Sequence, residues 1–340
     1  MKMVSRGTRN LSAKRSSQHP LTPDKIAGSL IKGFAAQKLL RVSIGVMWIV
    51  SGLLQAQPAM FTSDFYAKYP SRIMQSLLQQ VASGQPSWLH HLLLAGMAIW
   101  GRNPIIWNSL VVLLQLALGI SVVSRRPRRW WTPVLVSSLL WALFIWVFGE
   151  AFGNLFHFQA WNVVSGSPGT TFWLAFASVL LLALEGKSSI AWVSSFLRFF
   201  LSAVLLLLGI VQLIVPINWT SASVMASYAN AAALPQPSFL SLPIQALVLA
   251  VANVPHIGNL FIGLPLVVVG GLLFAIGWRK SILLIAWLWL FWSWWFGQDF
   301  GTVFSGLGTD VNSAPLLMMF TIAHRMMARH VGHGTLTSSS

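Results

Sequence analysis

Carboxylates are the first candidates for chemistry in this sequence, because they are so few. The 340 residues include only 6 Asp and Glu. Glu150 and Asp299 each closely follow a long apolar segment, and Asp310 lies in the polar stretch after the second of these segments. A carboxylate at a membrane boundary is costly unless it is paired, hydrated or used. With Asn154 nearby, these three carboxylates form a candidate site for a proton, a cation or a polar headgroup.

Two of these acids stand in a motif that occurs twice. Residues 148–156 read FGEAFGNLF, and residues 296–304 read FGQDFGTVF. Glycine at every fourth position lets two helix backbones approach closely, and Phe at the same spacing covers one side. We therefore interpret the motif first as a tight corner of helix packing, with the carboxylate site as the alternative. The glycines concerned are Gly149, Gly153, Gly297 and Gly301.

Four amide side chains lie within or near apolar segments, and we expect them to hold helices together. In lipid, amides of this kind form hydrogen bonds between helices, which satisfies groups that water cannot reach. Lining a ligand cavity is the alternative role. The four residues are Gln55, Asn108, Gln212 and Asn259.

No metal site is predicted. Cysteine is absent, which excludes disulfides, thiol chemistry and cysteine-ligated metals. Four histidines lack the spacing that would place two ligands on one helix face, namely His90, His91, His157 and His256. No nucleotide-binding, zinc-protease or nucleophile-elbow pattern occurs, so a stand-alone enzyme is the least favoured class.

Tryptophan is concentrated in residues 287–295, which contain five of the 18 tryptophans. Trp favours the membrane–water interface, so an aromatic belt is the default interpretation. A pocket for the flat ring of a quinone is the alternative. No other cofactor is evident from the sequence.

Composition indicates what kind of scaffold must position these residues. Hydrophobic residues make up 56% of the chain and charged residues only 8%, whereas soluble domains carry about 25% charged residues. So few charges cannot cover a water-facing surface, but they suit a surface that faces lipid. The net charge of +16 does not indicate nucleic-acid binding, because the basic residues cluster at the N-terminus and in short loops. Anionic lipid headgroups are the expected partner of the basic N-terminus.

Eight segments are apolar and long enough to cross a bilayer, and their charges predict an orientation. If the N-terminus is cytoplasmic, nineteen basic residues fall inside and three outside, a strong positive-inside bias. This predicts a protein of the plasma membrane with both termini in the cytoplasm. Residues 88–100 and 239–254 are then interfacial or re-entrant on the outer face. The eight spans are 40–56, 104–123, 131–148, 170–184, 197–215, 257–276, 281–296 and 314–328.

The segments outside the spans complete the predicted organisation. Residues 1–25 are expected to be disordered, and residues 26–38 to form a short helix on the membrane surface. The predicted divisions are a basic cytoplasmic segment, two membrane units and a disordered tail, at 1–38, 39–187, 195–329 and 330–340.

The two membrane units align with each other, which indicates an internal duplication. Gln55 corresponds to Gln212, and Asn108 to Asn259. The sequences QPSWL at 85–89 and QPSFL at 236–240 also match, as do Trp141 and Trp146 with Trp289 and Trp294. In the repeated glycine motif, Glu150 aligns with Gln298 and Asp299 with Ala151. The two acids are therefore not equivalent, although they can face one shared cavity. Because each unit has an even number of spans, the sequence predicts an all-α fold of two parallel four-helix repeats.

Arg41 and Arg198 open the first span of each unit, a Gly lies late in that span, and a polar residue follows three positions later. In this pattern each unit resembles the DoxX-like superfamily of four-helix membrane proteins. Gln55 and Gln212 stand where the family usually has Lys. The family includes DoxD, a membrane subunit associated with thiosulfate:quinone oxidoreductase. The resemblance therefore implies an accessory or quinone-linked redox subunit with a membrane or redox partner. A transporter or a lipid- or small-molecule-binding protein that uses the interface between the repeats is the alternative.

Overall fold

The protein is all-helical throughout the part of the chain that the structure describes. The computed structural model describes residues 23–62, 81–124, 130–157, 166–186, 189–214 and 236–335. Side chains are described from residue 35 to residue 328. The α-helices are α1 (Pro23–Gln55), α4 (Ser87–Trp100), α5 (Pro104–Val123), α6 (Trp131–Phe148), α7 (Thr170–Glu185), α8 (Ile190–Leu213), α10 (Ser238–Asn253), α11 (Pro255–Ile276), α12 (Lys280–Trp292) and α13 (Ala314–Thr335). The short elements are η1 (Pro58–Phe61), η3 (Ala151–Asn154), η6 (Ser293–Gly297) and η7 (Asp299–Thr302).

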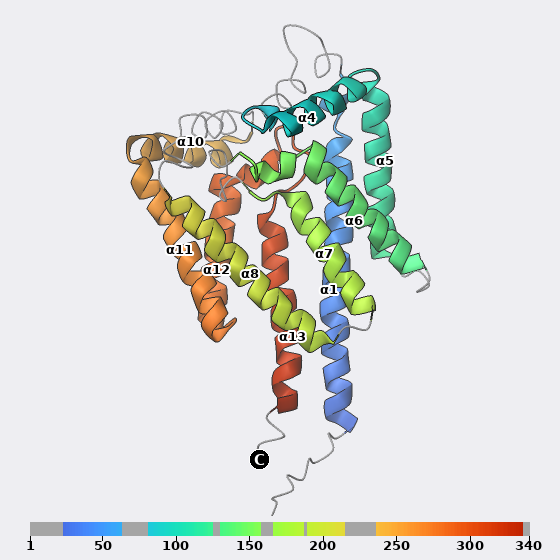
Figure 1. The fold of residues 1–340 in the computed structure, drawn as a ribbon, viewed down its shortest axis with the longest axis vertical. Coiled ribbons are helices and arrows are strands. Elements are labelled where there is room, and N and C mark those ends of the chain that lie inside the picture. Colours follow the sequence, from blue (N-terminus) through green and yellow to red (C-terminus); the bar gives the residue numbers. More distant parts are fainter. Residues whose placement is uncertain are drawn as a thin grey trace, which may run out of the picture.

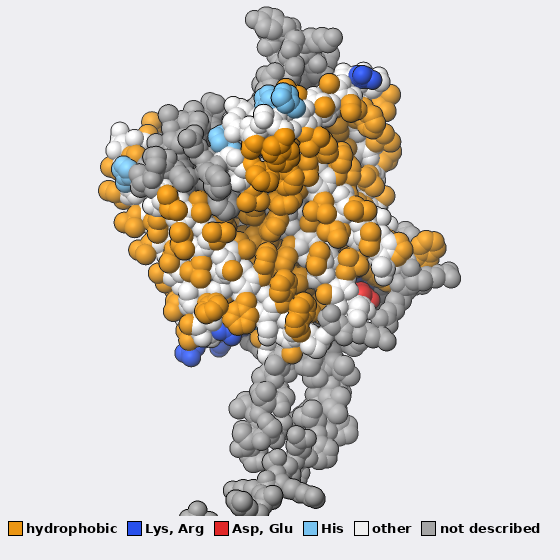
Figure 2. Space-filling model, in the orientation of Figure 1, with side chains coloured by type: hydrophobic (Ala, Val, Ile, Leu, Met, Phe, Trp, Pro, Cys, Tyr) orange, Lys and Arg blue, Asp and Glu red, His pale blue; other side chains and the backbone are white. Residues whose placement is uncertain are grey.

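Among the residues that the structure describes, five helices are long and apolar enough to cross a membrane. They are α5, α6, α8, α11 and the part of α1 from Ala35 to Gln55. Their outward side chains are apolar, as shown by Leu113 in α5 and Leu140 in α6, which are 64% and 62% exposed. Figure 2 shows hydrophobic side chains over the visible side of the molecule, with Lys and Arg at its ends. A surface of this kind indicates a membrane-embedded protein.

Two helices lie across one end of the bundle instead of along it. Figure 1 shows α4 and α10 across the same end of the molecule, next to the starts of α5 and α11. We refer to this as the α4/α10 end. Each of the two is one continuous helix. Helix α1 begins and α13 ends at the opposite end of the molecule (Figure 1).

The closest helix pairs are α1 with α5 and α8 with α11. Glycine makes both contacts possible. A Cβ at Gly119 of α5 would lie 2.6 Å from the carbonyl oxygen of Gly45 in α1. A Cβ at Gly270 of α11 would lie 3.1 Å from the carbonyl oxygen of Ser202 in α8. Small residues allow this backbone approach, which replaces lipid contacts with dense packing.

The core of the molecule is shared by both halves of the chain. One buried cluster runs through α1, α5, α6, α7, α8, α10, α11, α12 and α13. Helix α13 packs along α1 and also touches α7 and α8, so it joins the first half of the chain to the second. The largest fully buried side chains include Trp48, Trp173 and Phe320. The rings of Trp173 and Phe320 lie 5.8 Å apart.

Three predicted boundaries differ from the structure. Residues 26–38 do not form a separate surface helix, because α1 runs without a break from Pro23 to Gln55. The last helix, α13, continues to Thr335, past the predicted end of the second unit at 329. The predicted span 281–296 is not one α-helix, because α12 ends at Trp292 and the π-helical turn η6 follows it. The predicted disorder at 1–25 lies almost wholly outside the described residues.

Candidate functional site

The repeated glycine motif forms a left-handed turn in both halves of the chain. All four residues of Ala151–Asn154 have positive φ, and so do all four of Asp299–Thr302. Six of these eight residues are not glycine, and each of those six costs free energy in the left-handed region. Strain of this kind persists only where the surrounding structure holds it. The turn therefore marks a position that tertiary contacts have built.

Gly153 and Gly301 sit where each turn meets the loop before the next long helix. A Cβ at Gly153 would overlap the carbonyl oxygen of Pro168. A Cβ at Gly301 would overlap the carbonyl oxygen of Asp310. Both glycines also have positive φ, 61° and 73°. Close approach and backbone conformation both require glycine here.

One tryptophan in each half contacts both the loop and the turn. Trp146 donates from Nε1 to the carbonyl oxygen of Pro168 at 2.7 Å, and Trp294 donates in the same way to Val311 at 2.7 Å. Each indole also meets the Phe of its turn edge to face, Trp146 with Phe152 at 5.0 Å and Trp294 with Phe300 at 4.7 Å.

These contacts correct the first interpretation of the motif. It is not a corner where two helices pack through glycines at four-residue spacing, because α6 ends at Phe148 and the turn follows. Gly149 lies at the end of α6, and Gly297 is buried at the end of the π-helical turn. The glycines that make a close backbone approach, Gly153 and Gly301, do so against loops.

Glu150 and Asp310 meet at the first turn of α7. Glu150 Oε1 accepts a hydrogen bond from the backbone N–H of Thr171 at 3.2 Å. Asp310 Oδ1 accepts one from the hydroxyl of Thr170 at 2.8 Å, and another from the N–H of Asn312 at 2.6 Å. The start of a helix has unpaired N–H groups and a positive dipole end, which suits carboxylates. One acid comes from each half of the chain.

Burial makes both of these carboxyls easier to protonate. Loss of hydration, together with the neighbouring charge of Asp310, raises the pKa of Glu150 to about 8, against opposing hydrogen bonds from Thr171 and Thr170. Loss of hydration also raises the pKa of Asp310, against hydrogen bonds that lower it. Glu150 Oε2 is buried without a hydrogen-bond partner. The pair can therefore hold a proton near neutral pH.

Gln298 takes the place of Glu150 in the second half. Its Oε1 accepts a hydrogen bond at 3.1 Å from the N–H of Ala314, the first residue of α13. Its side chain is only 5% exposed. Sequence reasoning did not select Gln298, although its alignment with Glu150 was the signal that could have found it. The side chains of Glu150 and Gln298 thus each accept a hydrogen bond from a backbone N–H at the start of the next long helix.

Asp299 makes a different contact from Glu150, and neither acid lines the two cavities described below. Asp299 accepts a hydrogen bond from Gln236 Nε2, and burial raises the pKa of Asp299 to about 6, against that hydrogen bond. In the first half, Gln85 donates from Nε2 to Asn154 Oδ1 at 2.9 Å. The glutamine of each QPS sequence therefore contacts the left-handed turn of its own half.

The four amides form two pairs between helices. Gln55 of α1 donates from Nε2 to Asn108 Oδ1 of α5, and Asn108 Nδ2 donates back to the carbonyl oxygen of Gln55 at 3.2 Å. Gln212 of α8 donates from Nε2 to Asn259 Oδ1 of α11 at 2.8 Å. The amides do not line either cavity described below. Positions that correspond in the sequence therefore make corresponding contacts.

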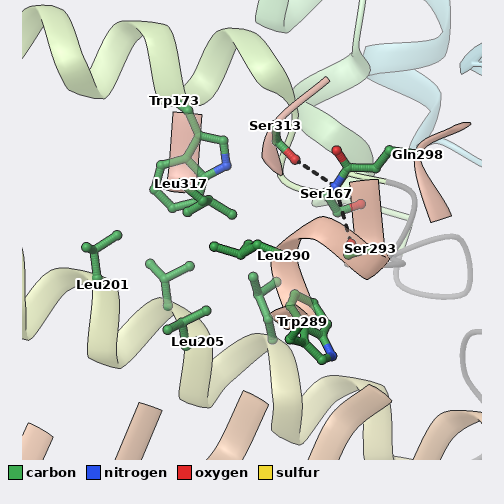
Figure 3. A pocket seen from close by; sticks show the side chains of 12 residues that line it. Ser167, Trp173, Leu201, Leu205, Trp289, Leu290, Ser293, Gln298, Ser313 and Leu317 are labelled. Carbon is green, nitrogen blue, oxygen red and sulfur yellow. Dashed lines mark hydrogen bonds between the residues drawn. The ribbon is translucent and has the colours of Figure 1, made fainter. Parts of the chain in front are cut away.

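A small cavity lies where the two halves of the chain meet, with room for roughly one water molecule. Its walls come from α7 and the loop before it, from α8, from α12 and the π-helical turn, and from the start of α13. Figure 3 shows a polar group at one end and leucines on the other sides. The lining residues are Ser167, Trp173, Leu201, Val204, Leu205, Leu208, Trp289, Leu290, Ser293, Gln298, Ser313 and Leu317.

A second cavity shares part of this wall and is almost wholly apolar. It lies between α8, α11, α12 and α13, and Thr321 and Trp278 are its polar members outside the shared wall. The residues common to both cavities are Leu201, Leu205, Trp289, Leu290 and Leu317.

The predicted histidines are not gathered into one group. His90 contacts the carbonyl oxygen of Ala82 at 2.9 Å and lies beside His91. The ring of His157 lies against Gly84, and burial lowers the pKa of His157. Within the described residues, no group of three or more His, Asp or Glu could hold a metal ion.

Comparison of the chain with protein families, with curated proteins and with solved structures finds no match. Function must therefore be argued from the described contacts and cavities.

Proposed function

We propose that the chain is a multi-pass protein of the plasma membrane built from two DoxX-like units. The eight spans are α1, α5, α6 and α7 in the first unit, and α8, α11, α12 and α13 in the second. Both termini lie in the cytoplasm, and the α4/α10 end faces outward. The matching Gln–Asn pairs and the two left-handed turns support a duplication. Parallel repeats of this kind are related by an axis along the membrane normal.

Its function, in this proposal, is to bind a small membrane-soluble molecule between the two units. A quinone is the class we favour, which would make the protein an accessory subunit of a redox system. The observation that carries this is the cavity whose walls come from both units. As it stands the cavity has room for roughly one water molecule, so a quinone ring enters only if the surrounding helices move apart. None of its 12 lining residues is acidic, basic or a histidine, so the walls favour binding over catalysis.

Mass spectrometry of ligands that co-purify from native membranes tests this function. The wild-type protein is expected to carry a quinone in nearly equimolar amount. Leu290→Trp and Leu205→Phe should expel it, because Leu290 and Leu205 are buried wall residues, 5% and 9% exposed. Leu288→Trp on the same helix is the matched control, since Leu288 is 64% exposed.

One outcome of this measurement would overturn the proposal. If the extracts from wild type, Leu290→Trp and Leu205→Phe have the same composition, the cavity does not hold the co-purified molecule. The folded state of each variant would be checked by gel filtration in the same detergent.

A proton-coupled transporter is the second candidate, and the carboxyl pair favours it. Glu150 and Asp310 come from different units and meet at α7, so a change in their protonation acts where the units join. Proteoliposomes with an imposed pH gradient test this candidate. A transporter would lose proton flux in Glu150→Gln and keep it in Asp299→Asn, because Asp299 lies in a separate contact with Gln236.

A further inference from the structure

A contact between two side chains joins the start of α10 to the left-handed turn η7. Gln236 lies two residues before α10 and donates from Nε2 to Oδ2 of Asp299, the first residue of η7. The side chain of Asp299 is only 4% exposed. The carbonyl oxygen of Leu240, in the first turn of α10, also accepts from Trp295 Nε1 at 3.4 Å. We refer to the contact between Gln236 and Asp299 as the α10 clasp.

Each member of the α10 clasp has a second oxygen that is buried without a hydrogen-bond partner, Asp299 Oδ1 and Gln236 Oε1. While Asp299 is ionised, both of these atoms are acceptors, so neither can satisfy the other. Each then carries the cost of a buried polar atom that has lost its water. A proton on Asp299 changes this, because a carboxylic acid has one O–H donor. The two unpaired oxygens can then share a single hydrogen bond.

The elements packed against η7 offer Asp299 no opposite charge. The closest of them are α10 and η6, and neither contains Asp, Glu, Lys, Arg or His. The sequence between Arg198 and His256 also contains no charged residue and no histidine, and His256 itself is exposed. A buried carboxylate without a counter-ion favours its protonated form.

The other acid of this half, Asp310, does not alter that preference. Its backbone carbonyl oxygen lies against Gly301, while its carboxyl binds Thr170. Loss of hydration raises the pKa of Asp299 from 3.8 to about 6, against the hydrogen bond from Gln236. The closed contact therefore holds a proton that an Asp299 released into water would lose. Stability that depends on this proton falls as the pH rises from 3.8 to about 6.

We propose that the α10 clasp is a pH-sensitive switch, in which protonated Asp299 donates a hydrogen bond to Gln236 Oε1 and accepts one from Gln236 Nε2. These two hydrogen bonds close the start of α10 against η7. When the pH rises, the proton leaves to water, both oxygens become acceptors, and the clasp opens. All four residues of η7 have positive φ, a conformation that persists only where neighbouring contacts hold it. The opening therefore loosens the turn as well as α10, with or without a ligand between the units.

The first half has a contact at the corresponding place that cannot respond to pH in this way. Gln85 lies two residues before α4 and donates from Nε2 to Asn154 Oδ1 at 2.9 Å. Neither of these amides ionises, so the contact is the same at every pH between 5 and 8. The two halves thus differ in one ionisable group, and Gln85 provides a matched control for the switch.

Cysteine labelling of the full-length protein in detergent measures the opening of the clasp, because the chain has no cysteine of its own. Leu240→Cys reports the opening, since Leu240 is 5% exposed, and Phe239→Cys is the control, since Phe239 is 67% exposed. The ratio of their rates with N-ethylmaleimide removes the effect of pH on the thiol itself. With pKa values of 3.8 and about 6 for the open and closed forms, this ratio should rise about 10-fold from pH 5 to pH 8.

Two further substitutions, each combined with these cysteines, locate the switch. Asp299→Asn supplies an N–H where the acid supplies its O–H, so the ratio should stay low at both pH values. Gln85→Leu removes the contact of the first half and should leave the rise unchanged. Infrared difference spectra between pH 5 and pH 8 detect the proton without any cysteine. A carboxylic-acid C=O band should be lost at pH 8 in wild type and be missing from the spectra of Asp299→Asn.

Four outcomes would overturn the switch. The first is a ratio that stays constant in wild type from pH 5 to pH 8, and the second is an equal rise in Asp299→Asn. A rise that Gln85→Leu abolishes would place the pH response outside the α10 clasp. Identical infrared difference spectra for wild type and Asp299→Asn would show that Asp299 carries no proton, even if a cysteine variant misfolds. A ratio that falls when Na⁺ is added at pH 8 would likewise replace the proton by a cation between the two oxygens.

Discussion

Thr170 donates a hydrogen bond from its hydroxyl to Asp310 Oδ1 at 2.8 Å. The two residues are separated by 140 positions in the chain, and their contact ties the loop before α13 to the first turn of α7. The next residue, Thr171, holds Glu150 through its backbone N–H. The start of α7 therefore contacts one carboxyl group from each half of the chain.

Glu150→Gln should change how stability depends on pH. The pKa of Glu150 is raised from 4.5 to about 8 in the folded protein. Between these pH values the unfolded chain loses the proton and the folded chain keeps it, so wild-type stability falls as pH rises through this window. Glutamine cannot ionise and can still accept from Thr171, as Gln298 accepts from Ala314. The variant should therefore gain stability relative to wild type, by at most a few kcal/mol at pH 8.

Thermal unfolding in detergent at a series of pH values checks this prediction. Asp299→Asn is the comparison, because the pKa of Asp299 rises only from 3.8 to about 6. The effect of Asp299→Asn on the pH dependence of stability should be complete by about pH 6. If Glu150→Gln and wild type lose stability in parallel from pH 5 to pH 8, then Glu150 does not hold its proton in that range.

Gly153→Ala and Gly301→Ala should each destabilise the protein by more than about 2 kcal/mol. Both glycines have positive φ, and an added Cβ would overlap a loop carbonyl oxygen in each case. Gly271→Ala in α11 is the matched control, since a Cβ there meets nothing within 4 Å. Its melting temperature should stay at or slightly above that of wild type. Equal melting temperatures for all three variants would contradict the proposed role of the turns.

The Gln–Asn pairs should contribute about equally in the two halves. Replacing either partner of Gln212–Asn259 by Leu removes the hydrogen bond that joins α8 and α11 at this position. A double-mutant cycle is expected to give a coupling of about 1 kcal/mol, typical of hydrogen bonds between membrane helices. The cycle at Gln55–Asn108 should give a similar value. A coupling near zero in one half alone would show that the two contacts are not equivalent in energy.

Cysteine labelling tests the proposed orientation, because the chain contains no cysteine of its own. Arg102→Cys lies exposed between α4 and α5, and Lys280→Cys lies exposed at the start of α12. An impermeant maleimide added to intact cells should label position 102 and leave position 280 unlabelled until the membrane is opened. The reverse pattern would place the α4/α10 end inside the cell.

Much of the helical architecture could be predicted from the chain alone. Apolar runs located α5, α6, α8 and α11, because a lipid-facing helix must be apolar over its length. The placement of segments 88–100 and 239–254 outside the spans, which was argued from charge, stays a prediction. The amides Gln212 and Asn259 were predicted to bond between helices, because lipid offers no other partner. The number of spans and the duplication stay predictions.

The candidate site could be predicted only in part. Glu150 and Asp310 were both selected, but Glu150 was paired with Asp299. The repeat aligned the two motifs that carry Glu150 and Asp299, and this alignment gave no sign that Glu150 and Asp310 both reach the start of α7. Gln298 and Trp173 were missed, since an amide and an indole in an apolar sequence carry no signal of a cavity.

The sequence by itself determined the class of protein and the residues that had to be glycine or amide. These follow from composition and from local spacing, which any membrane helix must obey. Only the tertiary structure decided that Glu150 meets Asp310, that the repeated motif forms left-handed turns, and that Trp173 faces a cavity. Each of these depends on contacts between segments far apart in the chain, such as that of Trp173 in α7 with Phe320 in α13. Local sequence cannot encode such contacts, because they exist only once the two halves pack together.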